Sequence, residues 1–336
     1  MKILLVTGSY PPDICGVAEY TEQLAETLQR AGAEVVVFSG RKWSLANAVV
    51  LNRDIMSVGA DILHMQYPAT GYGRHLGPQL LSLLQPYVTT IHECSQTHIL
   101  RRLSLYPFTL RAPRIIFTNE YEREYSRRFV PWIKSRTTVI PIGNGIPLGP
   151  DSVATIPNVV TNFGLIRPQK GLEDVIQMAR LCKQRANQLS VRIVGTVLPG
   201  HESYYDRLRD EAGDLSVEWV VGLNGTQLSC ALAETEVAYL PFPDGASERR
   251  SSLVAMLANK AAIITTHGRH TPSDMKEAVQ FAGSPVEAVE LAEAMFNNRE
   301  RLEAKRSTAT EYATRFSWDS IAAKHIAIYE RLIGRI

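Results

Sequence analysis

Short runs of valine, isoleucine and leucine recur along the whole chain, and amphipathic stretches separate them. Apolar on both faces, such runs are typical of parallel strands that helices cover on both sides. We expect strands at residues 3–7, 35–38, 62–65, 88–91, 115–118 and 138–140, and again at 159–163, 191–194, 217–221, 237–240 and 262–265. The alternation predicts right-handed β-α-β crossovers, and hence an α/β fold with doubly wound sheets.

A turn-rich linker at residues 141–150 separates the two halves, with three prolines and three glycines in ten residues. The chain of 336 residues is too long for one ordinary core. We therefore predict two Rossmann-like domains, residues 1–145 and 146–316, facing a central cleft at the carboxyl ends of their strands.

The chain ends in a predicted helix within residues 317–336, with Ser317 as its N-cap. Its apolar stripe consists of Trp318, Ile321, Ala322, His325, Tyr329 and Leu332. Such a stripe needs a partner surface. We expect this helix to pack back onto the first domain.

The composition, 45% apolar and 21% charged, is that of a soluble globular protein. No apolar run approaches the roughly 20 residues that span a bilayer. The four cysteines are scattered and include no Cys-x-x-Cys pair, which indicates neither a disulfide framework nor a zinc site. We therefore expect a cytoplasmic protein.

Cationic side chains are concentrated in residues 101–136, where nine basic residues stand against three acidic ones. The basic residues are Arg101, Arg102, Arg111, Arg114, Arg123, Arg127, Arg128, Lys134 and Arg136. One hypothesis is a solvated helical face. Another is a patch for anionic lipid, with a peripheral location at the inner face of the membrane, or for a polyanionic acceptor. Nucleic acid is disfavoured, because no aromatic platform or recognition motif accompanies the arginines.

The first expected strand leads through residues 8–17 into the first expected helix. This loop is neither the Gly-x-Gly-x-x-Gly fingerprint nor a P-loop, which disfavours a dehydrogenase. Gly16 would let the backbone approach an anion at the helix N-terminus. An ordinary strand-to-helix turn is the alternative.

A second loop, residues 162–172, contains Gly164, Arg167 and Lys170 before a helix. A diphosphate leaving group needs such cations, because negative charge grows on it as the sugar departs. The spacing favours this function over a solvated surface loop.

A third loop, residues 241–254, offers serine hydroxyls, Asp244, Glu248 and two arginines at a helix start. That mixture of donors and acceptors suits a polyhydroxylated ligand. The alternative is a capped helix whose arginines, Arg249 and Arg250, neutralise the two carboxylates.

His92 comes directly after the expected strand 88–91 and would face the cleft. A lone histidine is more often structural, so its position at a strand end leaves both roles open. His64, at the end of the previous strand, has the same placement with weaker support.

Five segments carry a resemblance to a known family: residues 10–20 (Tyr-Pro-Pro, then Gly-Val-Ala-Glu-Tyr), 90–93 (Thr-Ile-His-Glu), 140–146 (Ile-Pro-Ile-Gly-Asn-Gly-Ile), 164–171 (Gly-Leu-Ile-Arg-Pro-Gln-Lys-Gly) and 316–319 (Phe-Ser-Trp-Asp). With these segments the chain resembles the family 4 retaining glycosyltransferases over nearly its whole length.

The resemblance implies a GT-B fold, with a nucleotide-sugar donor bound mainly by the second domain and an acceptor by the first. It implies no metal and no cofactor beyond the nucleoside-diphosphate sugar, which is a co-substrate. Lys170 matches the family lysine that holds the diphosphate, and Gly16 the glycine near the donor phosphate. His92 matches the histidine beside the transferred sugar.

The chain departs from the family at two places. Leu165 stands where the family usually has its diphosphate arginine, and we expect Arg167 to substitute for it. The paired glutamates of the family fall at Ala246 and Val254, so Asp244 or Glu248 would have to supply the sugar contact. The donor-binding candidates are Gly16, Gly164, Arg167, Lys170, Gly195, Leu223, Asp244, Ser247, Glu248, Ser251, Ser252 and Val254.

The sequence therefore predicts a metal-independent transferase that retains the anomeric configuration, with His92, Lys170 and Arg167 as its catalytic candidates. Its acceptor would be a carbohydrate or a lipid-linked sugar, in bacterial polysaccharide or glycolipid assembly. One alternative is a nucleotide-sugar 2-epimerase of the same fold. The other is a sugar- or nucleotide-binding protein without turnover, for which the missing glutamates argue.

Overall fold

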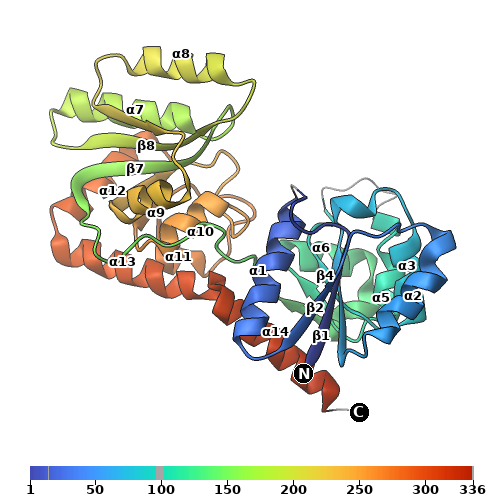
Figure 1. Cartoon of the computed structure of the whole chain (residues 1–336). Coiled ribbons are helices and arrows are strands. Elements are labelled where there is room, and N and C mark those ends of the chain that lie inside the picture. The colour runs from blue at the N-terminus through green and yellow to red at the C-terminus, as the bar shows by residue number, and fades with distance from the viewer. Residues whose placement is uncertain (14, 96–101, 335–336) are drawn as a thin grey trace. The chain divides into compact units, whose positions relative to one another are not determined.

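The structure is a computed structural model that describes residues 1–13, 15–95 and 102–334, and the chain divides into two compact units. Unit 1 comprises Met1–Gly143 and Ser317–Ile336, and unit 2 comprises Asn144–Phe316. Each unit contains a six-stranded parallel sheet with helices on both faces (Figure 1). The predicted α/β fold with two doubly wound sheets is thus confirmed.

The sheet of unit 1 has the strand order β2-β1-β3-β4-β5-β6. Its strands are β1 (Lys2–Thr7), β2 (Glu34–Phe38), β3 (Ile62–Tyr67), β4 (Val88–Ile91), β5 (Ile115–Phe117) and β6 (Thr137–Val139). Each expected strand of this half is present within two residues of its predicted bounds. The order reverses between β1 and β3, which makes this the position where an open α/β sheet binds ligands.

The helices of unit 1 cover both faces of its sheet. They are α1 (Gly16–Arg30), α2 (Ala48–Ser57), α3 (Gly77–Leu84), α5 (Tyr106–Arg111), α6 (Glu120–Phe129) and α14 (Trp318–Ile333). Ile3 and Leu5 of β1 point into the core shared with α1 and α14, whereas Leu4 and Val6 point into the core with α2, α3 and α5. Figure 1 shows α1 and α14 together on one side and α2, α3 and α5 on the other.

Helix α14 belongs to unit 1, where it packs against α1. The Ser317 hydroxyl caps it by accepting a hydrogen bond from the Ser320 N–H (3.2 Å). Trp318 packs on Tyr20 of α1, with ring centroids 5.4 Å apart. The same indole ring requires a glycine at position 143, because a Cβ there would lie 2.4 Å from the ring.

The sheet of unit 2 has the strand order β12-β11-β10-β7-β8-β9, so the order reverses between β7 and β10. Its strands are β7 (Ile156–Ile166), β8 (Ser190–Val197), β9 (Val217–Val221), β10 (Thr235–Leu240), β11 (Ala262–Thr265) and β12 (Val279–Phe281). Its helices are α7 (Leu172–Arg185), α8 (Glu202–Ala212), α9 (Gly225–Ala233), α10 (Ser251–Ala258), α11 (Met275–Ala278), α12 (Pro285–Phe296) and α13 (Arg299–Ala313).

Three strands of unit 2, β7, β8 and β12, differ from the prediction. Strand β7 continues to Ile166 and β8 to Val197, so residues 164–166, predicted as part of a loop, belong to a strand. The extension forms because Gly164, Leu165 and Ile166 pair with Gly195, Thr196 and Val197 of β8. Strand β12, three residues at the sheet edge, was not predicted.

None of the helices in the described ranges is long and apolar enough to cross a membrane.

Candidate functional site

A cavity of about 310 Å³ lies in unit 2 where the strand order reverses, at the carboxyl ends of β7 and β10. That volume is at the lower end of the range for small-molecule sites. The lining residues come from β7, β8 and β10, the loops after β7, β9 and β10, the segment before β7, and the first halves of α9 and α10. They are Ile146, Asn162, Phe163, Gly164, Leu165, Lys170, Gly195, Thr196, Leu223, Leu228, Leu240, Phe242, Ser251 and Ser252.

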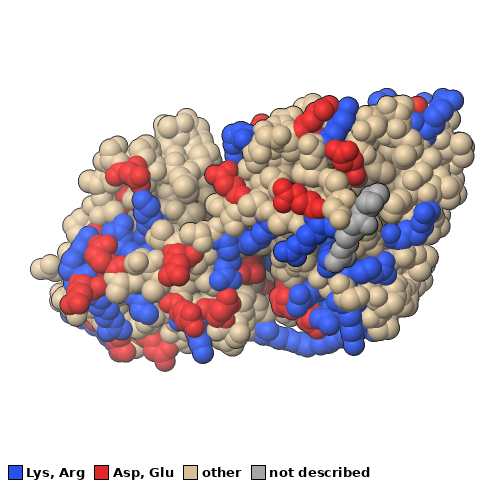
Figure 2. Space-filling view, turned by 90° about the horizontal axis from the view of Figure 1, so that it is seen from below, with Lys and Arg blue, Asp and Glu red and all other residues tan. Residues whose placement is uncertain are grey.

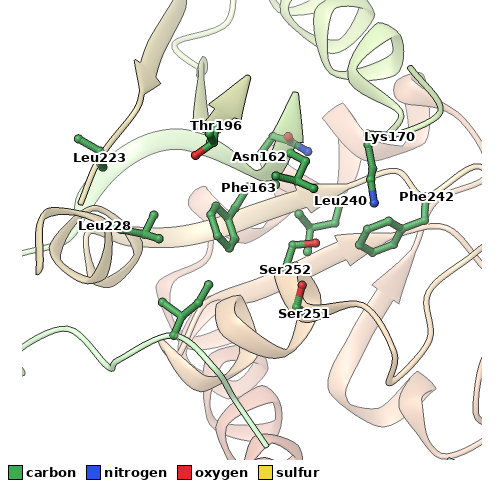
Figure 3. A pocket seen from close by; sticks show the side chains of 14 residues that line it. Asn162, Phe163, Lys170, Thr196, Leu223, Leu228, Leu240, Phe242, Ser251 and Ser252 are labelled. Carbon is green, nitrogen blue, oxygen red and sulfur yellow. The ribbon is translucent and has the colours of Figure 1, made fainter. Parts of the chain in front are cut away.

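The cavity has a polar side and an apolar side. Figure 3 shows Lys170 and Phe242 on one side and Leu223 and Leu228 on the opposite side, with Ser252 between them. Among the lining residues that the structure describes, Lys170 is charged and none is acidic. The cavity therefore favours a ligand that carries negative charge at one end and an apolar group at the other.

Lys170 is held beside the β10 loop by the backbone that follows it. Gly171 has a left-handed φ of 76°, and a Cβ there would lie 1.8 Å from the carbonyl oxygen of Pro241. A glycine is needed for this approach. Burial, and then repulsion from Arg167 and Arg250, lowers the pKa of the Lys170 amino group, while Asp244 opposes the shift. An anion beside this amine would relieve that repulsion.

Helix α10 begins at the cavity with Ser251 and Ser252 in its first turn. Arg250 occupies the N-cap position of this helix. Its side chain makes no capping hydrogen bond, so it satisfies none of the N–H groups of the first turn. Backbone N–H groups and the helix dipole attract anions at such an end. The two hydroxyls add further donors beside Lys170.

Six of the predicted donor-binding residues line the cavity together: Gly164, Lys170, Gly195, Leu223, Ser251 and Ser252. Packing also requires a glycine at position 195, because a Cβ there would lie 2.0 Å from the carbonyl oxygen of Gly164 on β7.

The remaining candidates of unit 2 lie outside the lining. Arg167 is close enough to Lys170 to repel its charge, and its guanidinium donates to the Pro168 carbonyl (3.3 Å). Asp244 is paired with Arg250. Val254 is buried in the core beneath α10, only 4% exposed.

Glu248 and Ser247 also lie outside the lining. The Glu248 carboxylate accepts hydrogen bonds from the Tyr312 hydroxyl (3.1 Å) and the Arg315 guanidinium (3.3 Å). Burial raises the pKa of Glu248, against the opposing effect of these two partners. The Ser247 side chain makes no hydrogen bond with a described residue that would indicate a role in ligand binding.

Eight lining residues were not among the predicted donor-binding residues: Ile146, Asn162, Phe163, Leu165, Thr196, Leu228, Leu240 and Phe242. Thr196 and Phe242 could have been predicted as site residues from the sequence, because each comes shortly after an expected strand. Leu228 had none, because it reaches the cavity from the first half of α9.

On unit 1, Gly16 is the first residue of α1, beside the position where the strand order of that sheet reverses. No described atom lies within 4 Å of where its Cβ would be, apart from its chain neighbours. Cys15, at the N-cap, accepts a hydrogen bond from the Thr70 hydroxyl (2.9 Å). Burial raises the pKa of the Cys15 thiol, but bonds from Thr70 and from the Val17 and Ala18 N–H groups outweigh it, giving a pKa of about 7.

His92 follows β4, and both its backbone and its ring are held. Its N–H donates to the Tyr67 carbonyl (2.9 Å), and its ring packs edge-on against Tyr20 at 4.8 Å. Nε2 lies 3.0 Å from Oε1 of Gln66. Burial, and then the neighbouring His325, lowers the pKa of His92 to about 3, so the ring is neutral at physiological pH.

His64 is fully buried, although the sequence placed it at the same strand-end position as His92. Its Nδ1 lies 2.6 Å from the Tyr329 hydroxyl of α14, and its Nε2 lies 2.8 Å from the Thr90 hydroxyl. Such contacts are those of a structural histidine. In the described ranges, no group of three His, Cys, Asp or Glu side chains is placed to hold a metal ion.

Searches of solved structures find proteins of the same fold. A glycosyltransferase from Rickettsia africae matches with a TM-score of 0.75 at 12% identity, over 99% of this chain and 98% of that one. Sucrose-phosphate synthase from Thermosynechococcus elongatus matches with a TM-score of 0.66 at 14% identity, over all of both chains. HepE from Anabaena, in complex with UDP and glucose, matches with a TM-score of 0.64 at 14% identity, over 98% of this chain and all of that one.

These similarities assign the fold, which is GT-B, the two-domain architecture of those glycosyltransferases. No protein-family model matches the sequence, and no curated protein matches it. Activity is therefore argued from the site.

Proposed function

We propose that the protein is a retaining glycosyltransferase that binds a nucleoside-diphosphate sugar in the cavity of unit 2. The observation that carries the proposal is that Lys170 and the first turn of α10 line the same cavity. A diphosphate fits the Lys170 side, and a nucleobase fits the apolar side at Leu223 and Leu228 (Figure 3). The UDP complex of HepE, a protein of the same fold, supports this ligand class.

The cationic side of the cavity would promote departure of the nucleoside diphosphate. Negative charge grows on the leaving oxygen as the bond to the sugar breaks, and donors already in position stabilise it most. Lys170 and the α10 N–H groups would supply that stabilisation, and Arg167 would join them from the neighbouring loop. Because cationic side chains do this work, no metal ion is required.

Retention of configuration follows, in this proposal, from attack by the acceptor hydroxyl on the face from which the diphosphate leaves. No Asp or Glu is among the described lining residues, so neither a carboxylate nucleophile nor a carboxylate base is offered there. Catalysis would rest on positioning and on leaving-group stabilisation. Unit 1 would bind a carbohydrate or lipid-linked acceptor, with the neutral ring of His92 orienting the reacting groups.

A sugar- or nucleotide-binding protein without turnover is the second candidate. Ala246 and Val254, which the resemblance aligns with the paired glutamates of the family, are 1% and 4% exposed. No carboxylate at those two positions can therefore grip the sugar or the ribose. An epimerase has less support, since it needs acid and base carboxylates and the described lining has none.

A ligand panel followed by product analysis tests the proposal. Nucleoside diphosphates and their sugars should raise the melting temperature, because a ligand at 100 times its Kd adds about 2.7 kcal/mol of stability. The bound donor is then incubated with oligosaccharide and glycolipid acceptors, and anomeric configuration is read by NMR. A transferred sugar of retained configuration supports the proposal, an inverted product contradicts it, and binding without product favours the second candidate.

A further inference from the structure

Positive charge is concentrated in residues 41–136 of unit 1. This stretch has 13 lysines and arginines against 6 acidic residues, a net charge of +7. The rest of the chain has 23 against 28, a net charge of −5. In the face that Figure 2 shows, cationic and acidic side chains are intermixed. The imbalance therefore belongs to one stretch of unit 1, the stretch that forms α2, α3, α5 and α6.

An aromatic surface lies on the same stretch and is here called the aromatic patch: Tyr106, Tyr121, Tyr125, Phe129 and Trp132. Contacts between its members make it continuous. Tyr121, Tyr125 and Phe129 follow one another along α6, with ring centroids 6.1 and 5.1 Å apart. Tyr106 of α5 packs on Trp132 at 5.8 Å, and its hydroxyl donates to the Phe129 carbonyl (3.4 Å).

The aromatic patch combines buried and exposed edges. Tyr106 and Tyr125 pack against the core, whereas Phe129 is 50% and Trp132 46% exposed. Of the four tryptophans, all in described positions, Trp132 is the most exposed. Aromatic side chains with a polar tip or edge favour the boundary between water and lipid.

Most arginines of the 101–136 run serve internal contacts, so the run alone does not make a binding surface. Arg111 donates to the carbonyls of Leu83 and Leu84, and Arg136 to those of Thr109 and Ala112. Arg123 and Arg127 pair with glutamates of their own helix. Arg101 lies outside the described residues.

Two cations at the aromatic patch are exposed and have no ion pair with a described residue. Arg128 precedes Phe129, and Lys134 follows Trp132 by two positions. A third cation, Arg102, lies over the ring of Tyr125 at 5.3 Å. The exposed rings of Phe129 and Trp132 thus occur at positions neighbouring the exposed cations Arg128 and Lys134. This combination complements a surface with negative headgroups above an apolar interior.

We propose that the aromatic patch docks unit 1 onto anionic lipid membrane, with Phe129 and Trp132 entering the headgroup layer and Arg128 and Lys134 contacting phosphates. The proposal is independent of the activity proposed above. A protein interface would also favour tyrosine, tryptophan and arginine. The net charge of +7 on this stretch favours the anionic lipid surface.

Vesicle sedimentation tests the proposal on the full-length protein, using phosphatidylcholine alone or with about 30% phosphatidylglycerol. We expect binding to the anionic vesicles only, weakened in about 0.5 M salt, where the Debye length is short. Phe129→Ser with Trp132→Ser should weaken binding about tenfold or more, because two exposed apolar side chains are lost. Arg128→Glu with Lys134→Glu should have at least as large an effect.

Matched variants on unit 2 control for general effects. Val286→Ser removes an apolar side chain of similar exposure (41%), and Lys276→Glu with Arg301→Glu reverses two exposed cations. Both should bind like the wild type. Brominated lipid should quench the wild-type fluorescence, and Trp132→Tyr should bind yet lose most of that quenching.

Three results would overturn the proposal: no binding to anionic vesicles, equal binding to neutral ones, or unchanged binding by both patch variants with their fold intact. A wild-type dimer that the patch variants dissociate, without vesicle binding, would identify the surface as a protein interface and would also overturn it.

Discussion

Oε1 of Gln66 lies 3.0 Å from Nε2 of His92, and the amide nitrogen of the same glutamine lies 3.3 Å from Nε2 of His64. The amide oxygen can only accept, so His92 carries its proton on Nε2 and its Nδ1 is an acceptor. The amide NH₂ can only donate, so Nε2 of His64 is unprotonated and its Nδ1 donates to Tyr329. The tautomer of His92 is therefore connected to α14 through Gln66, His64 and Tyr329.

We expect Gln66→Leu to lower the transfer rate while leaving donor affinity in unit 2 unchanged. The loss should be about three- to tenfold, the equivalent of one net hydrogen bond. Gln79→Leu is the matched control, because Gln79 is a buried glutamine that donates to Tyr67 (3.0 Å) and not to a histidine. Steady-state kinetics and donor titration separate the two effects. A rate equal to that of the control variant would deny Gln66 a positioning role.

Lys170→Ala should weaken nucleoside-diphosphate binding without unfolding the protein. The expected loss is roughly 1.5–3 kcal/mol, the range for a hydrogen bond to a charged group. Lys183→Ala is the control, since Lys183 is an exposed lysine of the same unit that pairs with Asp214. Calorimetric titration with a nucleoside diphosphate measures both. Unchanged affinity in the folded Lys170 variant would exclude this loop from the site.

A donor with 2′-deoxyribose should cost little compared with the ribose form. No acidic residue is among the described lining residues, and Val254 is buried in the core, so no carboxylate there pairs with the ribose hydroxyls. The penalty should stay under about 1.5 kcal/mol, the net contribution of one neutral hydrogen bond. Competition binding with the two nucleotides gives the number. A hundredfold penalty would show that another residue recognises the ribose.

Transfer activity should survive chelation by EDTA. Lys170 already supplies a positive charge to the cavity, and the described part of the chain has no cluster of three His, Cys, Asp or Glu placed to hold a metal. Activity is assayed before and after EDTA treatment and dialysis. Complete loss, with rescue by magnesium or manganese, would contradict the cation-based mechanism.

Unit 1 should lose stability as the pH falls from about 6.5 toward 4. Burial lowers the pKa of His325 to about 4 and of His92 to about 3, and holds the pKa of His64 well below its usual value. The unfolded chain protonates these rings below about pH 6.5, whereas the native state does not. The unfolded state therefore binds more protons, and each ring removes up to about 1.4 kcal/mol per pH unit.

His325→Gln should reduce this slope, and His75→Gln, at an exposed position, should not. Melting temperatures between pH 7.5 and 5 provide the comparison. Equal slopes for the wild type and the His325 variant would show that His325 is not held neutral.

The strands of both sheets could be predicted from the sequence because residues such as Leu4 and Leu5 are apolar on successive positions and face opposite cores. The same pattern located the loops that supply Lys170, Ser251 and Ser252, since ligand sites of these folds lie at strand ends. Leu228 and the extension of β7 escaped prediction, because they depend on pairing and packing with distant segments.

Tertiary structure alone decided where the side chains of those loops point. Glu248 is bonded to Tyr312 and Arg315 of a distant segment and not to the cavity, and no local pattern indicates that choice. The sequence suggested equivalent strand-end positions for His64 and His92, yet His64 lies inside β3, where the Tyr329 hydroxyl of α14, 265 positions away, contacts it. The local sequence determines which face of a strand a residue occupies, but its partners come from segments that only the folded chain brings together.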